Sequence, residues 1–437
     1  MTRPAVTRRQ LLQQTGVLIV GFSSVGGMAD AANDASTFSA RSRKPGRVDS
    51  WLTISRNGIV TVYSGKVDTG AGLKTAFVQI VADELDVPVE QVRMLMADTA
   101  LTPDQGKSVA SQGISIGAQP LRVAAAVARR ALVDQAAIAL RVSSSELETV
   151  AGIVRVKAAP ARHLAYGELI GEQTLAIDLE LDRQTSYGPL LKAGVPLQSY
   201  KTRRNVGKPM PRLDVPAKAT GTFAYVHNVR VPGMLHGRVI RPPAFGAKLI
   251  SVDEASVSSI PHVRVVRRAD FLGVVAEREE YAVKAAATLK ATWSAGDPLP
   301  DQRMQYEDLK NAPVLGQLDT LHVGDVDAAF AGSKVRLREE YAFPYQMHAM
   351  LGPSCAVADV REDRATVWSG TQWPQGTQND IAKMLGLATD NVRVIWHEAS
   401  GSYGRLACDD AAADAALLSA AVHRPVRVQW MRHDEHG

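Results

Sequence analysis

"TVYSGKVDTGAGLKTAFVQIVADELDVPVEQVRML", residues 61–95, is the stretch that decides the fold. Its pattern predicts a strand over 58–64, a loop containing Gly70 and Gly72, and a helix beginning near Leu73. Glycines at the start of a helix let the backbone approach a ligand closely, and a helix N-terminus favours an anion. The loop therefore predicts either an anion-binding turn or a plain strand-to-helix connection. It lacks the third glycine of a dinucleotide fingerprint and the Gly-Lys-Ser/Thr of a P-loop.

The same pattern returns at 366–395 as "TVWSGTQWPQGTQNDIAKMLGLATDNVRVI". Both copies start with Thr-Val-aromatic-Ser-Gly, predict helices ending at Leu85 and Leu385, and continue into strands beginning at Val92 and Val392. A small-residue loop and an alanine-rich helix follow each copy. This internal repeat predicts an α+β fold with two related α/β lobes, whose loops converge on one ligand.

Composition shifts along the chain predict its domain organisation. The sequence between the repeats contains short strands broken by Pro-Gly and Pro-Pro, which indicates a compact α+β insert. The expected segments are a signal peptide (1–31), a basic linker (32–47), the first lobe (48–200), the insert (201–300), a second linker (301–320) and the second lobe (321–437).

The N-terminus carries an export pattern. Arg8 and Arg9 precede the apolar stretch 16–25, and Ala29-x-Ala31 offers a cleavage site. This pattern resembles a twin-arginine signal, which exports folded proteins and therefore predicts a periplasmic protein. Membrane contact is expected only through the signal segment, if it stays uncleaved. A disordered basic tail is the alternative interpretation.

Charge and cysteine content exclude several classes of function. The net charge is +5, but much of the excess is in the N-terminal segment, and no aromatic-and-basic ladder suggests a nucleic-acid partner. The cysteines are Cys355 and Cys408, too few for a cysteine-ligated iron–sulfur cluster or a covalent haem on this chain. We expect free thiols, with a disulfide as the alternative.

Two further loops contain candidate site residues. In "KSVAS" (107–111), the hydroxyls precede a helix, and Ser111 or the nearby Ser115 is expected to act as its N-cap. In "GSYGRL" (401–406), glycines flank Tyr403, whose ring either meets a ligand or packs into the core.

Acidic side chains and histidines leave the catalytic residue unidentified. "HDEH" (433–436) predicts a solvated helix start rather than a metal site. The candidate carboxylates, none of which the spacing favours, are Glu84, Glu339, Glu340 and Glu398.

Four segments in order carry a resemblance to a known family. They are "GKVDTGAGLKTAFVQIVADELDVP" with "DTALTPDQGKS", "KATGTFAYVHNVRVPGMLHGRVIRPP", "PYQMHAMLGPSCAVADV", and the C-terminal run from "GSYGRL" to "MRHDEHG". Together they resemble the molybdopterin-binding large subunits of the xanthine dehydrogenase/aldehyde oxidase family, in the exported branch that includes isoquinoline 1-oxidoreductase and nicotinate dehydrogenase. The insert resembles that family's α/β hammerhead domain.

The resemblance implies a set of cofactor-binding residues. Thr69–Gly72 match the family's Gly-Gln-Gly loop, the "KSVAS" serines lie in a companion loop, Gln372 matches a glutamine near the metal, and 401–404 match a Gly-Gly-Phe-Gly loop. The implied residues are Gly70, Ala71, Gly72, Ser108, Ser111, Gln372, Gly401, Ser402, Tyr403 and Gly404. The implied cofactor is molybdopterin, as the cytosine dinucleotide, which holds molybdenum through its own dithiolene, so the protein supplies no metal ligand.

The resemblance also implies an activity and partners. The reaction is hydroxylation of an aldehyde or N-heteroaromatic carbon with water as the oxygen source. Electrons pass to a [2Fe–2S] small subunit, with a c-type cytochrome as a further partner.

Two departures from the family pattern stand out. Ala71 replaces the loop glutamine, and the family's Gly-x-Gly-Glu glutamate has no counterpart before Gly437. We therefore expect the N-terminal portion of such a large subunit, which exposes apolar surface when alone. The alternatives are a non-catalytic truncated relative that only binds partners or cofactor, and an unrelated periplasmic α/β binding protein.

Overall fold

The computed structural model of the protein describes residues 43–171, 175–318, 320–407 and 411–436. The expected signal peptide, most of the basic linker, and Cys408 lie outside the described residues.

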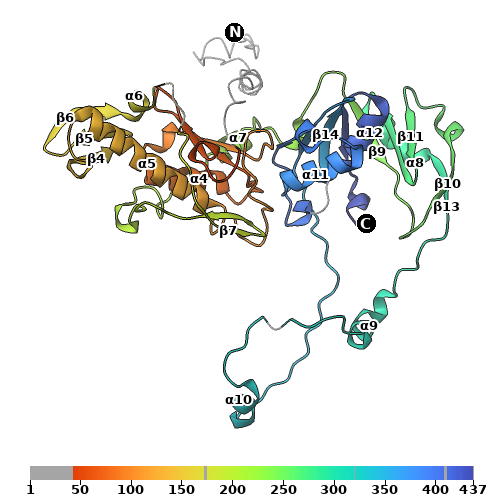
Figure 1. The fold of residues 1–437 in the computed structure, drawn as a ribbon. Helices are drawn as coiled ribbons and strands as arrows, with labels where there is room; N and C mark the ends of the chain where they lie inside the picture. The colour runs from red at the N-terminus through yellow and green to blue at the C-terminus, as the bar shows by residue number, and fades with distance from the viewer. Residues whose placement is uncertain (1–42, 172–174, 319, 408–410, 437) are drawn as a thin grey trace, which may run out of the picture.

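Helices and strands alternate along the described chain (Figure 1). The α-helices are α4 (Leu73–Leu85), α5 (Ala118–Leu140), α6 (Tyr166–Ile170), α7 (Val215–Ala219), α8 (Glu279–Thr288), α9 (Gln305–Asn311), α10 (Val326–Gly332), α11 (Pro374–Leu385) and α12 (Ala412–Val422). The strands of the first half are β1 (Leu52–Ile54), β2 (Val60–Ser64), β3 (Val92–Met96), β4 (Leu147–Val150), β5 (Ile153–Val156), β6 (Ala159–Ala165), β7 (Leu181–Thr185) and β8 (Gly188–Leu191). Those of the second half are β9 (Leu235–Val239), β10 (Leu249–Asp253), β11 (Arg264–Arg268), β12 (Phe271–Ala276), β13 (Lys290–Trp293), β14 (Cys355–Val360), β15 (Ala365–Ser369), β16 (Val392–Trp396) and β17 (Val426–Gln429).

The internal repeat is confirmed in the strand register. β2 pairs with β3 in parallel, with Thr61 opposite Arg93, and β15 pairs with β16 in parallel, with Thr366 opposite Arg393. In each copy a helix, α4 or α11, connects the two strands. The expected helix ends and strand starts agree with the structure, so the mixed α+β class and the two related lobes are confirmed.

The first lobe packs two helices over the sheet β1–β2–β3. Its core includes Trp51 from the chain start, Phe77 and Leu85 of α4, and Leu121 and Leu132 of α5, all 1% exposed or less. The many alanines of α5 let α4 approach closely, since a methyl group adds little bulk at the contact. The lobe also carries the sheet β4–β5–β6 and the hairpin β7–β8.

The second lobe is organised by a seven-stranded sheet with the order β11–β12–β9–β17–β14–β15–β16. β9 belongs to the expected insert, and it pairs in parallel with β17 near the C-terminal end of the described chain. Helix α12 buries Ala415, Ala416 and Leu418 against this sheet. The insert therefore shares a hydrophobic core with the second lobe, while the individual domain limits stay a prediction.

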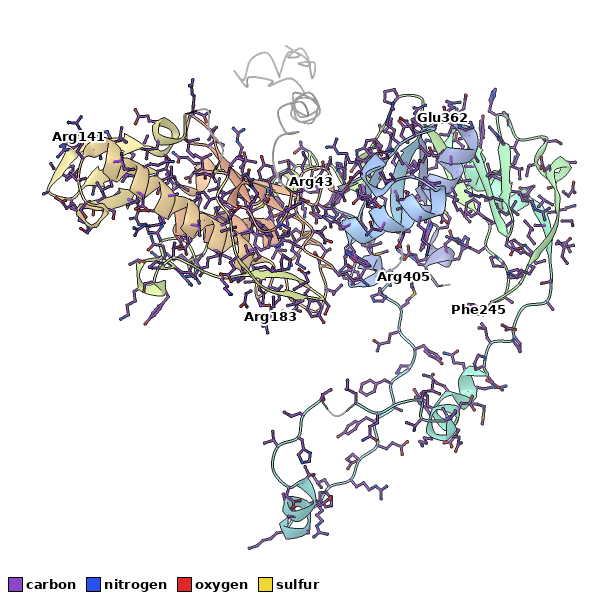
Figure 2. All side chains as sticks on the ribbon, in the orientation of Figure 1. Arg43, Arg141, Arg183, Phe245, Glu362 and Arg405 are labelled. Atoms are coloured by element: carbon purple, nitrogen blue, oxygen red, sulfur yellow. The ribbon has the colours of Figure 1, made fainter. Side chains whose placement is uncertain are left out.

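A long excursion leaves the second lobe between 297 and 349, and we call it the arm. Figure 1 shows the arm running away from both lobes, and its described residues form the helices α9 and α10 and a short 3-10 helix at Gln302–Met304. In Figure 2 its side chains are sparse compared with the lobes. Large apolar side chains are exposed along it, among them Leu315 at 98% and Leu337 at 80%.

Among the described residues, no helix combines the length and apolar character that crossing a bilayer requires.

Candidate functional site

The two repeats meet at the ends of their parallel strand pairs. The chain leaving β3 runs antiparallel to β16, where the Thr99 amide donates to the Val394 carbonyl (3.0 Å) and the Trp396 amide donates to the Ala97 carbonyl (3.0 Å). Arg393 adds a two-pronged ion pair to the buried Asp98, with N–O distances of 3.0 and 2.6 Å. The loops that follow the repeated strands are therefore brought to one junction.

Gln372 and Ser108 connect the lobes at this junction. The Ser108 amide donates to the Gln372 carbonyl (2.9 Å), and Gln372 Nε2 donates to the Ser108 carbonyl (2.6 Å). The Ser108 hydroxyl also accepts from the Val67 amide (3.0 Å), which ties in the first glycine loop. The structure thus brings together loops that are 264 residues apart in the chain.

The Gly401 loop joins the same network through Ser402. The Ser402 hydroxyl, 1% exposed, donates to Gln372 Oε1, so both ends of the Gln372 amide bond protein atoms. The backbone N–H of Gln372 donates to the Leu406 carbonyl (2.8 Å). In this arrangement Gln372 fixes three loops, and its role at a metal stays a prediction.

The first glycine loop is closed by a carboxylate. Asp68 accepts from the amides of Gly70 (3.0 Å), Gly72 (3.0 Å) and Lys74 (2.9 Å). The anion-binding interpretation of these amides is therefore wrong, because Asp68 already occupies them. Gly72 adopts a φ of +82° immediately before α4, a conformation that favours glycine.

Tyr403 does not pack into the core. Its side chain is 66% exposed, and it stands between Gly401 and Gly404 with a φ of +54°. The core-packing interpretation is therefore wrong, and the ring is available for contact. Gly401 has a φ of +115°, and a Cβ there would lie 3.3 Å from the Tyr403 ring, so the backbone of this loop is shaped for a residue without a side chain.

The expected serine caps of α5 are absent. The residue before α5 is Gly117, which makes no side-chain cap, and the Ser115 hydroxyl donates instead to Gln112 Oε1 (2.6 Å). Ser111 is exposed with a φ of +56°. It lies near the start of the same loop as Ser108, but only Ser108 joins the described junction network.

An ionic cluster behind the glycine loops was missed by sequence reasoning. Lys218 Nζ lies 2.6 Å from Glu398 Oε1 and 2.6 Å from Asp214 Oδ2, and all three side chains are at most 19% exposed. Burial raises the pKa of Glu398, against the opposing effect of Lys218. Burial lowers the pKa of Lys218, but hydrogen bonds to both carboxylates outweigh it and raise the pKa.

Lys66 is a second buried cation beside the junction. Its ammonium donates to the backbone carbonyls of Lys107 (2.7 Å) and Tyr187 (2.6 Å), and the residue is 0% exposed. Burial lowers the pKa of Lys66 to about 8. The side chain ties the first glycine loop to the Ser108 loop and to the turn between β7 and β8.

A pocket of about 330 Å³ opens beside this network. Its polar lining includes Lys107, Thr371 and Thr377, and the Lys107 ammonium lies 4.4 Å from the centre of the Trp373 ring. The lining also includes the Asp380 carboxylate, and the Thr371 and Thr377 hydroxyls bond each other (2.8 Å), so the pocket carries charges of both signs. The pocket adjoins the junction through Lys107, Thr371 and Leu406, but none of the candidate cofactor-binding residues lines it.

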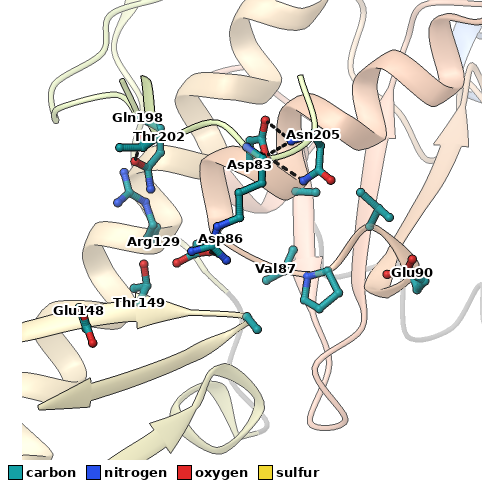
Figure 3. Close-up of a pocket in the computed structure, with 15 residues that line it drawn as sticks. Asp83, Asp86, Val87, Glu90, Arg129, Glu148, Thr149, Gln198, Thr202 and Asn205 are labelled. Carbon is teal, nitrogen blue, oxygen red and sulfur yellow. Dashed lines mark hydrogen bonds and ion pairs between the residues drawn. The ribbon is translucent and has the colours of Figure 1, made fainter. Parts of the chain in front are cut away.

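A larger pocket of about 530 Å³ lies elsewhere, at the C-terminal end of α4. Figure 3 shows Asp83 bonded to Asn205, with Arg129, Asp86 and Glu148 around the opening. None of the candidate site residues lines it, so its size alone does not make it the functional site.

The remaining candidate carboxylates either form ion pairs with basic side chains or are exposed. Glu84 pairs with Arg122 (3.0 Å) in the first lobe, and Glu340 pairs with Lys310 (2.8 Å) on the arm, where Glu339 is also exposed.

Glu435 of "HDEH" is 3% exposed and accepts from the Ser354 amide (2.7 Å), so the solvated-helix interpretation is wrong there. Within the described ranges, no cluster of three His, Cys, Asp or Glu could hold a metal. Cys355 is a buried free thiol.

Both halves of the junction match known sequences. Residues 13–225 and residues 308–436 match two families, each described as a molybdopterin cofactor-binding domain, and each range contains one copy of the repeat. A nicotinate dehydrogenase chain of Pseudomonas putida is 40% identical over 440 residues, which cover 98% of this chain. The chain belongs to the molybdopterin-binding subunits of the xanthine dehydrogenase family.

The chain spans only part of the length of the relatives that it matches. The beta subunit of isoquinoline 1-oxidoreductase from Brevundimonas diminuta is 30% identical over 98% of this chain. The chain spans 36% of the Pseudomonas protein and 60% of the Brevundimonas protein. The crystal structure of quinoline 2-oxidoreductase from Pseudomonas putida 86 aligns with a TM-score of 0.43 and 19% identity, over 53% of this chain and 35% of that one.

Proposed function

We propose that this chain forms the cofactor-holding part of a molybdenum oxidoreductase large subunit. The observation that carries the proposal is the convergence of repeat-related loops: Gln372 of the second lobe bonds both Ser108 of the first lobe and Ser402 of its own lobe. Each lobe contains a match to a molybdopterin-binding family, so one cofactor at their junction accounts for both matches.

The junction residues would hold the cofactor by backbone and side-chain contacts. The glycines of the 70–72 and 401–404 loops carry no side chain that would hold a ligand away from the backbone, and Lys107 supplies a positive charge beside Trp373. When bound, the molybdenum cofactor supplies oxygen-atom transfer coupled to two-electron chemistry, and the protein orients and tunes it. The chain's own contribution is to fix the loops and to limit water at the buried Gln372 and Ser402 side chains.

The finer assignments belong to the same proposal. The names of the relatives support an N-heteroaromatic or aldehyde substrate and an enzyme of several subunits. The family resemblance supports molybdopterin as its cytosine dinucleotide, and electron transfer to a [2Fe–2S] small subunit with a c-type cytochrome beyond it. The paired arginines at the N-terminus support export by the twin-arginine route to the periplasm.

Molybdenum and pterin analysis tests the proposal. The chain is purified from a host that makes the cofactor, alone and together with an iron–sulfur small subunit. Near-stoichiometric metal and pterin in either preparation supports a cofactor-holding subunit, and the comparison shows whether a partner is needed. Absence of both from both preparations would contradict the proposal and favour the non-catalytic relative.

A further inference from the structure

The ionic cluster around Lys218 reaches both glycine loops. On one side, Arg212 Nη1 donates to the Gly70 carbonyl (2.6 Å), and its other nitrogens bond Asp214. On the other side, Lys218 bonds Glu398, which stands three residues before Gly401. The path Gly70–Arg212–Asp214–Lys218–Glu398 therefore runs without a gap from the first lobe to the second.

The segment that carries the cluster is held by backbone bonds to both lobes. The Leu213 amide donates to Thr75 Oγ1 of α4 (3.0 Å), and the Val226 amide donates to the Glu398 carbonyl (2.9 Å). Figure 1 shows α7, which contains Lys218, between the two lobes. The cluster therefore bridges the two lobes.

Burial makes this cluster stiffer than a surface ion pair. The side chains of Glu398 and Asp214 are 9% and 8% exposed, and the Lys218 ammonium lies 4.8 Å from the centre of the Phe223 ring. Exposed ion pairs contribute little because water screens them, whereas removing one partner of a buried pair leaves an uncompensated charge.

We propose that Lys218 is a positioning residue that latches the Gly70 loop to the Gly401 loop through Asp214 and Glu398. The charged groups that face it are Arg212, Asp214, Glu398 and the nearby Asp68. Only the consequence for cofactor binding rests on the proposed function, because the latch joins protein segments with or without a ligand. With the latch open, the two loops stay joined through Ser108, Gln372 and Ser402, but they lose their second connection, and the site between them is less rigidly preformed.

Hydrogen exchange of the full chain tests the latch directly. Lys218→Met is expected to speed exchange at least about tenfold in peptides covering both 66–75 and 397–406, since a charged hydrogen bond is worth more than one tenfold step. Lys218→Arg keeps the charge and should retain most of the protection. Lys192→Met, which removes a lysine from the exposed pair with Glu180, is the matched control and should change neither peptide.

The outcomes separate the latch from general instability. Glu398→Gln keeps the side-chain volume and should speed exchange in the same two peptides, 66–75 and 397–406, by a smaller factor. This variant tests the latch even if Lys218→Met fails to fold. Two results would overturn the latch: an unchanged exchange rate in either loop of Lys218→Met, or an equal loss of protection from exchange in Lys218→Met and Lys218→Arg.

Metal analysis of the same variants separates the latch from the proposed function. If the wild type holds molybdenum, Lys218→Met should lose it and Lys218→Arg should keep it. Equal metal content in wild type and Lys218→Met, each co-expressed with the small subunit, would overturn the role of the latch in cofactor binding. If the wild type holds none in either preparation, the proposed function fails, while the exchange data still decide the latch.

Discussion

Asp68 is the residue on which the shape of the first glycine loop depends most. It accepts three amide hydrogen bonds at 2.9–3.0 Å, and its side chain is buried. Asp68→Ala should lower the free energy of unfolding by about 2 kcal/mol or more, because three amides lose their acceptor. Chemical denaturation measures this loss. Asp104→Ala, which removes one exposed bond to the Gly106 amide, is the control and should cost less than about 1 kcal/mol.

The buried Lys66 gives the protein a defined pH dependence. Its pKa is lowered from 10.5 to about 8 in the folded state, so the unfolded chain binds the proton more tightly between these values. The free energy of unfolding should therefore rise between pH 8 and 10.5, by up to about 3 kcal/mol from this group.

Comparison of wild type with Lys66→Met isolates this effect from other titrating groups. The free energy of unfolding of the wild type minus that of Lys66→Met should increase as the pH rises from 8 to 10.5. A difference that stays flat from pH 8 to 10.5 would contradict the assignment.

Residue roles were only partly predictable from sequence. The sequence pattern indicated the two glycine loops. Ser108 and Gln372 were implied as site residues only by the family resemblance. It favoured no carboxylate, since Glu398 becomes notable only through its bond to Lys218, 180 residues away. The anion-binding interpretation of the first glycine loop failed for a local reason: Asp68, two residues before Gly70, is itself the anion that the amides bind.

At the scale of elements, the two copies of the repeat offer a matched pair of arginines. Arg93 of β3 and Arg393 of β16 occupy the same register position opposite Thr61 and Thr366. Arg93 is exposed, whereas Arg393 bonds Asp98 across the lobe junction. Arg393→Met should lower the free energy of unfolding by about 2–3 kcal/mol, because Asp98 is left buried and unpaired.

The equivalent Arg93→Met should cost less than about 0.5 kcal/mol, as for most surface substitutions. Urea denaturation of both variants measures the contrast. Equal losses in the two variants would contradict the junction described above.

Element boundaries in the repeat were predictable because local periodicity and capping set them. The pairing of β9 with β17 was not, because it joins strands almost 190 residues apart, and parallel pairing leaves no turn signal in the sequence. The insert therefore looked separate in the sequence although it shares a sheet with the second lobe.

At the scale of the whole molecule, the arm is the feature that governs solution behaviour. It exposes apolar side chains including Leu337 (80%), Tyr341 (78%) and Phe343 (74%). We expect the chain alone to self-associate, since exposed apolar surface of this extent drives association. Replacing these three residues with serine should lower the mass measured by light scattering at equal concentration, while the melting temperature stays within about 2 °C. A wild-type chain that is monodisperse and melts cooperatively would contradict this.

The same feature predicts where proteases cut. Lys334, Arg336 and Arg338 lie on the exposed arm, so trypsin should cleave there before it cleaves either lobe. Mass spectrometry of early fragments identifies the sites. Initial cleavage at Arg129 or Arg130 within α5 would show that the first lobe is less stable than its buried core indicates.

The central claim is that the junction loops hold molybdopterin, and a pair of glycines tests it most directly. Gly401 lies in the junction loop with a φ of +115°, and Gly386 ends α11 in the same lobe with a φ of +72° and open space around it. Valine is strained at both positions, so the two substitutions share a backbone cost. Molybdenum and pterin are measured in wild type, Gly401→Val and Gly386→Val, each co-expressed with an iron–sulfur small subunit. We predict that Gly386→Val keeps the wild-type content and Gly401→Val loses most of it; equal retention by both variants would contradict a cofactor at this junction.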